Sequence, residues 1–226
     1  MIKKCLVPIC LLLLNQALAQ TTYFSAQEPT PTGGAITIAV SSAEENEGNN
    51  YFYEAERNER SGDFNDAIIY FSKAAFEYNI SKNFTRYGTA LLRLSNVHYL
   101  LSNYSEAEQV VLNVALKNYS RIGSKSGQMA SYSQLGKICL SANKLTESLW
   151  FYTQQGILAQ QTRNNNAYLE SIMGIAQVKI KKKEFAMAAK DLNRLETLAR
   201  SYNNKQFTGK IKEARALMVE KKKLKS

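Results

Sequence analysis

YFYEAERNERSGDFNDAIIYFSKA, residues 51–74, places two small residues on either side of a polar turn, and this arrangement decides the fold. Ala55 is the first small residue and Ala67 the second, three positions after Phe64. The first small residue recurs with gaps of 40, 41, 40 and 40 residues, at Ala55, Ser95, Gly136, Ala176 and Ala216. Self-similarity at a period of about 20 to 50 residues is typical of solenoids, whose stacked units bury an apolar face that no single unit can bury. The sequence therefore predicts an all-α repeat protein.

A second row of small residues marks the other helix of each unit. It recurs three residues after an apolar residue, at Ala67, Ala107, Ser148 and Ala188. Small side chains in both rows let two helix backbones approach closely, so we expect an antiparallel helix hairpin in each unit. Short polar breaks separate the helices of a pair, at residues 61–63, 102–103, 142–144 and 182–184. We expect longer loops between units, around residues 79–83, 123–127, 163–166 and 202–205.

These two rows resemble the tetratricopeptide repeat (TPR), whose hallmark is a large residue, Leu-Gly, an aromatic, a turn, Ala, an aromatic and Ala again. The first unit matches it with Tyr51, Ala55, Gly62-Asp63-Phe64, Ala67, Phe71 and Ala74, and the third with Tyr132, Leu135-Gly136, Leu145, Ser148 and Tyr152. The resemblance covers roughly residues 48–223. It implies a right-handed superhelical solenoid of about four helix hairpins and a C-terminal capping helix, whose concave wall holds extended peptides or partner helices.

The chain departs from the TPR pattern in two ways. Its period is 40 or 41 residues, whereas family repeats most often have about 34. The closing proline of the common repeat is absent from every unit. The longer period resembles the long-helix variants found in exported sensor regions and regulatory proteins.

The N-terminal part of the chain lies outside the repeats. Lys3 and Lys4 precede an apolar run that ends in Ala17-Leu18-Ala19, which is the pattern of a secretory signal peptide. We therefore expect residues 1–19 to be removed and the chain to be exported, either periplasmic or extracellular. Residues 20–47 are expected to form a disordered or extended tether. The repeat domain is expected at 48–226, with units at about 48–82, 83–125, 126–165 and 166–205 and a capping helix at 206–223.

Few residues are suited to catalysis, metal binding or disulfide formation. Without the leader, Cys139 is the only cysteine, so no intramolecular disulfide can form, and its place on an apolar helix face predicts a buried, inert thiol. His98 is the only histidine, which excludes the common metal sites and a catalytic set with a second histidine. No glycine-rich phosphate loop is present. The sequence therefore predicts no enzyme, no cofactor and no metal site.

Charge is distributed unevenly along the chain. Residues 20–80 hold 3 basic and 10 acidic residues, a net charge of −7, whereas residues 81–226 hold 24 and 9, a net charge of +15. A basic end of this kind is either a solvated face or a docking site for an anionic surface. Nucleic acid is a poor candidate for an exported chain without a recognisable binding module. The acidic first unit and basic last unit could also stack head to tail between molecules, which leaves the oligomeric state open.

A candidate binding surface follows from the first row of small residues. If these residues lie at close helix contacts, the next residue of each helix faces the groove, and positions four residues before and after it share that face. The expected partner-binding residues are Phe52, Glu56, Arg60, Leu92, Asn96, Lys137, Met173, Gln177 and Lys181. We expect the polar side chains to bind a partner backbone, and the apolar ones to anchor its apolar side chains.

The sequence thus favours an exported, non-enzymatic scaffold that binds a protein or peptide partner. One alternative is a sensory input subunit that works with a membrane histidine kinase or regulator. Another is a structural protein that attaches to an anionic envelope surface through its basic C-terminal end. The chain itself contains no transmembrane segment by its hydropathy.

Overall fold

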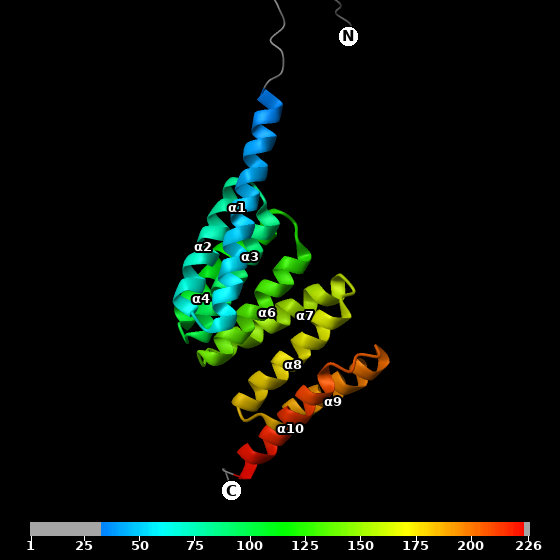
Figure 1. Cartoon of the computed structure of the whole chain (residues 1–226). Coiled ribbons are helices and arrows are strands. Elements are labelled where there is room, and N and C mark those ends of the chain that lie inside the picture. Colours follow the sequence, from blue (N-terminus) through cyan, green and yellow to red (C-terminus); the bar gives the residue numbers. More distant parts are fainter. Residues whose placement is uncertain (1–32, 224–226) are drawn as a thin grey trace, which may run out of the picture.

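The computed structural model describes residues 33–223, and within this range every regular element is a helix (Figure 1). The expected signal peptide and residues 20–32 lie outside the described residues. The predicted all-α class is confirmed, and the helices form a repeat-like architecture. The elements are α1 (Gly33–Ser61), α2 (Phe64–Ile80), α3 (Phe84–Leu100), α4 (Tyr104–Gln109), the π-helix η1 (Val110–Ala115), α5 (Leu116–Arg121), α6 (Lys125–Ser141), α7 (Leu145–Gln161), α8 (Asn165–Lys181), α9 (Phe185–Ser201) and α10 (Phe207–Lys223).

Each helix packs mainly on its neighbours in the chain, and the first helices of successive units, α3, α6, α8 and α10, also contact one another in series. No helix among residues 33–223 is long and apolar enough to cross a membrane.

The loops between units have three residues, the same length as most loops within units and contrary to our expectation, except for residues 202–206 between α9 and α10. The reason is that every helix from α3 to α9 that precedes a loop ends in the same way. After α3, for example, Asn103 N–H donates to the His98 carbonyl and Ser102 N–H to the Tyr99 carbonyl, at 2.9 and 3.0 Å. These two hydrogen bonds form a Schellman motif, which reverses the chain in about three residues.

The motif places a left-handed residue two positions after the last residue of the helix. Six loop residues in this conformation are not glycine: Lys82, Ser102, Asn143, Arg163, Lys183 and Asn203. Arg163 has a φ of 55° and an exposed side chain. A non-glycine side chain in this conformation costs about 1 kcal/mol or more, because its Cβ approaches the following carbonyl oxygen.

We expect Arg163→Gly to raise the free energy of unfolding by up to about 1 kcal/mol, or the melting temperature by roughly 2–4 °C, because the loss of Cβ strain exceeds the entropic cost of glycine. Gly123→Ala is the matched opposite change, since Gly123 has a φ of 69° and open space around its Cβ position. Thermal unfolding followed by circular dichroism should therefore shift in opposite directions for the two variants. A lower melting temperature for Arg163→Gly would contradict the argument.

The second hairpin contains one extra residue, and the structure shows where it is accommodated. Its second helix runs from Tyr104 to Arg121 as α4, η1 and α5, whereas α2, α7 and α9 each have 17 residues. The π-helical segment Val110–Ala115 widens the helix and absorbs the insertion. This accounts for the single gap of 41 residues among gaps of 40.

The two rows of small residues lie at buried crossings within the hairpins. In α3 and its partner, Ser95 Oγ donates to the Ala107 carbonyl at 2.8 Å, and in the next hairpin Ser148 Oγ donates to the Gly136 carbonyl at 2.7 Å. A hydroxyl of one helix can reach the backbone of the other only where the two axes are close. Ala216, in α10, is exposed instead, because no second helix follows α10 among the described residues.

Two tyrosines are inserted between glycines of neighbouring helices. The Tyr119 ring occupies the space where a Cβ on Gly88 or Gly127 would lie, at 2.5 and 2.1 Å from the nearest ring carbon. Tyr152 lies in the same way against Gly136 and Gly174, at 2.8 and 2.4 Å. These rings link α3 to α6 and α6 to α8, so they set the spacing between units.

The expected tether differs from the structure, because α1 begins at Gly33 and not near residue 48. Residues 41–47, SSAEENE, include alanine and glutamate, which have high helix propensity, so the helix continues upstream of its contact with α2. α1 therefore has 29 residues, and its N-terminal part projects past the end of α2 (Figure 1).

Cys139 is fully buried, in agreement with the expected inert thiol. Burial raises the pKa of its thiol to about 12. The nucleophilic thiolate is therefore scarce at neutral pH.

Candidate partner-binding groove

The series of first helices forms one side of a groove with a volume of about 780 Å³. α6, α8 and α10 supply most of its wall, and single residues of α3 and α7 complete it. The lining residues are Tyr99, Ser133, Lys137, Leu140, Ser141, Tyr152, Glu170, Met173, Gly174, Gln177, Ile180, Lys181, Phe207, Lys210, Glu213, Ala214, Leu217 and Lys221. A volume of this size is within the range of ligand sites, which is about 300 to 1,000 Å³.

Three successive helices present the same positions to the groove. Each contributes one residue directly after the small residue of the first row, with a second residue four positions before it and a third four positions after it. These triplets are Ser133, Lys137 and Ser141 on α6, Met173, Gln177 and Lys181 on α8, and Glu213, Leu217 and Lys221 on α10. Because residues four apart lie on one helix face, each triplet forms a stripe along the groove.

Of the predicted partner-binding residues, the structure brings together those of the third and fourth units. Lys137, Met173, Gln177 and Lys181 all line this groove. The predicted residues of the first two units do not line it: Phe52, Glu56, Arg60, Leu92 and Asn96.

The first two units use these positions for contacts between α1 and α3. Arg93 of α3 forms ion pairs with Glu59 at 2.5 Å and with Glu56 at 3.4 Å. Asn96 Nδ2 donates to the other Glu59 carboxylate oxygen at 2.9 Å. Glu56 and Asn96 are therefore occupied within the chain.

The apolar residues among the predicted partner-binding residues of the first two units are partly buried. The Phe52 ring packs edge-on against Phe71, with 5.3 Å between ring centroids, and Leu92 packs against the core of the central hairpins. Arg60 is exposed near the end of α1. The predicted partner-binding residues therefore line the groove only on α6 and α8.

Sequence reasoning missed several lining residues that share repeat positions. Tyr99, Leu140 and Ile180 follow one another at gaps of 41 and 40 residues, and Glu170 and Lys210 are 40 apart. The α10 triplet was also missed, although Leu217 directly follows Ala216 of the first row. Extending the register of the repeats into the last helix would have found it.

Four lysines line the groove, and none of them forms an ion pair within the described part of the chain: Lys137, Lys181, Lys210 and Lys221. Lys181 Nζ donates to the Leu140 carbonyl at 2.6 Å, which joins the C-terminal ends of α8 and α6. Lys137 Nζ lies 4.3 Å from the centroid of the Tyr99 ring. These contacts fix the side chains and leave their positive charges uncompensated by a carboxylate.

The floor of the groove is apolar and aromatic. Met173, Ile180 and Phe207 are buried, and Tyr152 reaches the groove from α7. Burial raises the pKa of the Tyr152 hydroxyl, so this side chain is neutral at physiological pH. The arrangement can hold an apolar side chain of a partner while the lysines bind its carboxylates.

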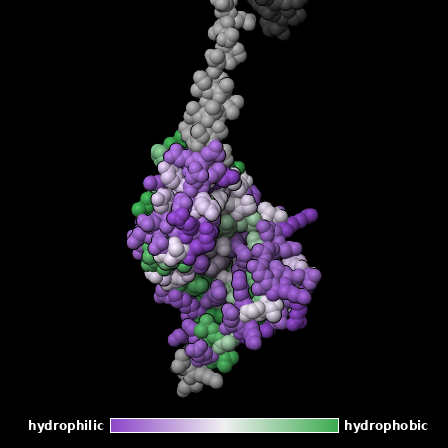
Figure 2. Space-filling model, in the orientation of Figure 1, coloured by the Kyte–Doolittle hydropathy of each residue, from purple (hydrophilic) through white to green (hydrophobic). Residues whose placement is uncertain are grey.

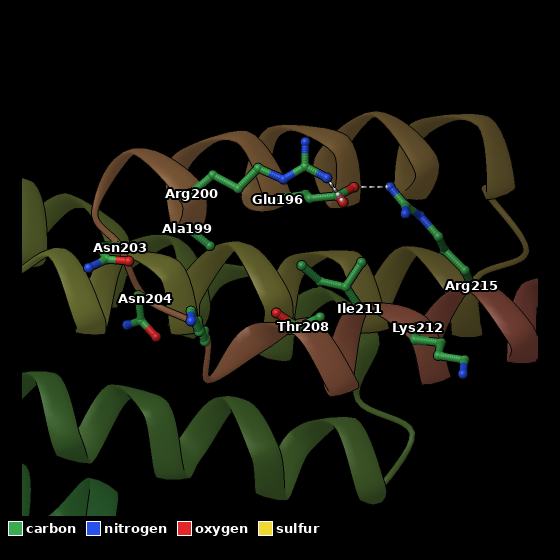
Figure 3. A pocket seen from close by; sticks show the side chains of 10 residues that line it. Glu196, Ala199, Arg200, Asn203, Asn204, Thr208, Ile211, Lys212 and Arg215 are labelled. Carbon is green, nitrogen blue, oxygen red and sulfur yellow. Dashed lines mark hydrogen bonds and ion pairs between the residues drawn. The ribbon is translucent and has the colours of Figure 1, made fainter.

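A second pocket, of about 450 Å³, lies between α9 and α10. Figure 3 shows the Glu196 carboxylate between Arg200 and Arg215, which bind it at 2.6 and 2.7 Å. The Arg215 guanidinium, together with Arg200, holds the pKa of Glu196 below its ordinary value. This carboxylate already neutralises two of the cations that line the pocket. The pocket is therefore a weaker candidate than the groove for binding an acidic ligand.

No cluster of three or more His, Cys, Asp or Glu residues that could hold a metal ion occurs among the described residues. The His98 Nδ1 is buried without a hydrogen-bond partner, and burial lowers the pKa of this side chain. His98 does not line the groove.

Neither the family models nor the curated proteins compared with this chain give a match. The class of protein therefore rests on its helical, repeat-like architecture and on the groove between its first helices.

Proposed function

We propose that this chain is an exported, non-enzymatic scaffold of the tetratricopeptide type, whose helix hairpins form a right-handed solenoid that holds a protein partner in its groove. The period of 40 residues and the two rows of small residues support the repeat assignment. The short loops of similar geometry support it further, because they give successive hairpins a similar shape.

One observation carries the binding role. The same three positions of α6, α8 and α10 line a single groove, and they combine lysines, an amide, hydroxyls and one carboxylate with Met173 and Leu217. A surface that mixes apolar anchors with polar groups of fixed position is typical of sites that bind a protein segment.

The test compares capture of partners by the chain without residues 1–19 and by two variants. Lys137→Ala with Gln177→Ala removes two exposed groove side chains, and Lys117→Ala with Lys190→Ala removes two exposed side chains that do not line it. We expect the groove variant to lose about tenfold or more in affinity for the captured protein, with little change in melting temperature. Equal capture by all three proteins would contradict the assignment.

The identity of the captured protein distinguishes a scaffold from a sensory input subunit. A membrane sensor in the captured fraction would favour a sensory input subunit over a scaffold. Retention on anionic vesicles that is lost in high salt, and unaffected by the groove variant, would instead favour attachment through the basic C-terminal end.

A further inference from the structure

We propose that the groove binds the N-terminal part of α1, residues 33–47, from a second copy of this chain. The inference rests on the groove proposed above as the partner-binding site, and it names the partner. It would join molecules head to tail, because the segment and the groove belong to opposite ends of the array (Figure 1).

The charge of the groove favours an acidic occupant. Its lining holds two glutamates, Glu170 and Glu213, and four lysines that form no ion pair with any described residue. Glu170 already accepts hydrogen bonds from Asn166 and Gln155, at 3.2 and 3.4 Å. The groove therefore has an excess of positive charge that an acidic segment would neutralise.

Residues 33–47 have the complementary composition. The sequence GGAITIAVSSAEENE contains three glutamates, no lysine or arginine, and the aliphatic residues Ile36, Ile38 and Val40. An acidic segment with aliphatic residues matches a groove that combines four lysines with the buried Met173, Ile180 and Phe207.

The N-terminal part of α1 lies beyond the stretch of the helix that packs against α2 (Figure 1). Tyr78, two residues before the end of α2, already lies against Gly48 and donates a hydrogen bond to Asn49 at 2.8 Å. The preceding residues of α1 extend past the end of α2 (Figure 1). An isolated helix of this length is only marginally stable in water, so contact with another surface would stabilise it.

The lengths of segment and groove are similar. Fifteen helical residues span about 22 Å at 1.5 Å per residue. The two steps from α6 to α8 and from α8 to α10 span roughly 16–20 Å at the usual separation of packed helices.

Because α1 is continuous and runs away from α10, its N-terminal part points away from the groove of its own chain (Figure 1).

Charge reversal tests the proposal on the chain without residues 1–19. Sedimentation velocity at about 100 µM protein should show association in about 0.05 M NaCl that weakens in about 0.5 M NaCl. Glu44→Lys with Glu45→Lys, and separately Lys137→Glu with Lys210→Glu, should each weaken self-association by about tenfold or more. An equimolar mixture of these two variants should associate again, because the reversed segment then meets the reversed groove and the unchanged segment meets the unchanged groove.

Lys117→Glu with Lys190→Glu is the matched control, since it makes the same change of charge on exposed residues outside the groove and should leave association unchanged. A monomeric wild-type chain at low salt would overturn the proposal, and so would a failure of the mixed variants to associate. Capture of a different protein through the groove would still support the proposed function in that case. The experiments therefore distinguish failure of the self-association proposal from failure of the proposed function.

Discussion

Gly127→Ala is expected to lower the free energy of unfolding by about 2–3 kcal/mol, and the melting temperature by roughly 5–10 °C. A Cβ at this position would lie 2.1 Å from the Tyr119 ring. This ring also lies against Gly88 of α3 and is buried, so it has no free direction in which to move. The extra methyl group must therefore separate α6 from the preceding hairpin or force Tyr119 out of its preferred rotamer.

Gly209→Ala is the matched control for this substitution. Gly209 also lies in a helix, α10, but apart from its chain neighbours and the adjacent backbone of its own helix nothing described lies within 4 Å of its Cβ position. Alanine there should stabilise the protein by about 0.5–1 kcal/mol, because it restricts the unfolded chain and favours the helix. Chemical denaturation of both variants gives the comparison directly.

A double-mutant cycle identifies the cause. Tyr119→Ala alone should destabilise the protein by several kcal/mol through the cavity that it leaves. In the Tyr119→Ala background, Gly127→Ala should cost little, because the ring that it would displace is absent. Additive costs would show that the effect of Gly127→Ala does not arise from this contact.

The sequence period predicted the helices well because it reflects a backbone requirement. Small residues recur where two helices must approach, as the bonds of Ser95 and Ser148 to opposite carbonyls show. The single 41-residue gap was visible in the sequence, but its cause was not. Whether an extra residue enters a loop or widens a helix depends on packing around it, and here η1 absorbs it.

The site was only partly predictable, because residues at equivalent positions of different repeats need not have the same neighbours. Lys137 and Gln177 are exposed in the groove, whereas Asn96 at the equivalent position donates to Glu59. That difference depends on the long side chains of Glu59 and Arg93, whose pairing cannot be read from helical spacing. The loops between units show a related limit, since Lys82 and Arg163 adopt left-handed conformations that sequence rules reserve mainly for glycine and asparagine.

Phe207→Ala is expected to release α10 from the rest of the protein and to remove one wall of the groove. Phe207 is the first residue of α10 and is fully buried in a cluster that includes Leu169 and Leu195. Truncating a buried phenylalanine costs about 3–5 kcal/mol. Since α10 packs mainly on α8 and α9 at the end of the described array, this loss falls mainly on the docking of one helix.

Hydrogen exchange followed by mass spectrometry measures this release. In the Phe207→Ala variant, amides of residues 207–223 should exchange about 100-fold faster or more, while α6 and α7 remain protected, because opening of a terminal element does not require global unfolding. Leu217→Ala is the control, because Leu217 lines the groove but is 42% exposed, so α10 should keep its protection. If α10 stays protected in the Phe207→Ala variant, contacts other than this anchor hold the helix. If protection is instead lost equally in all helices, the array unfolds as one cooperative unit and α10 is no separate terminal element. Only loss confined to α10 makes the groove a site whose last wall can open independently of the hairpins that precede it.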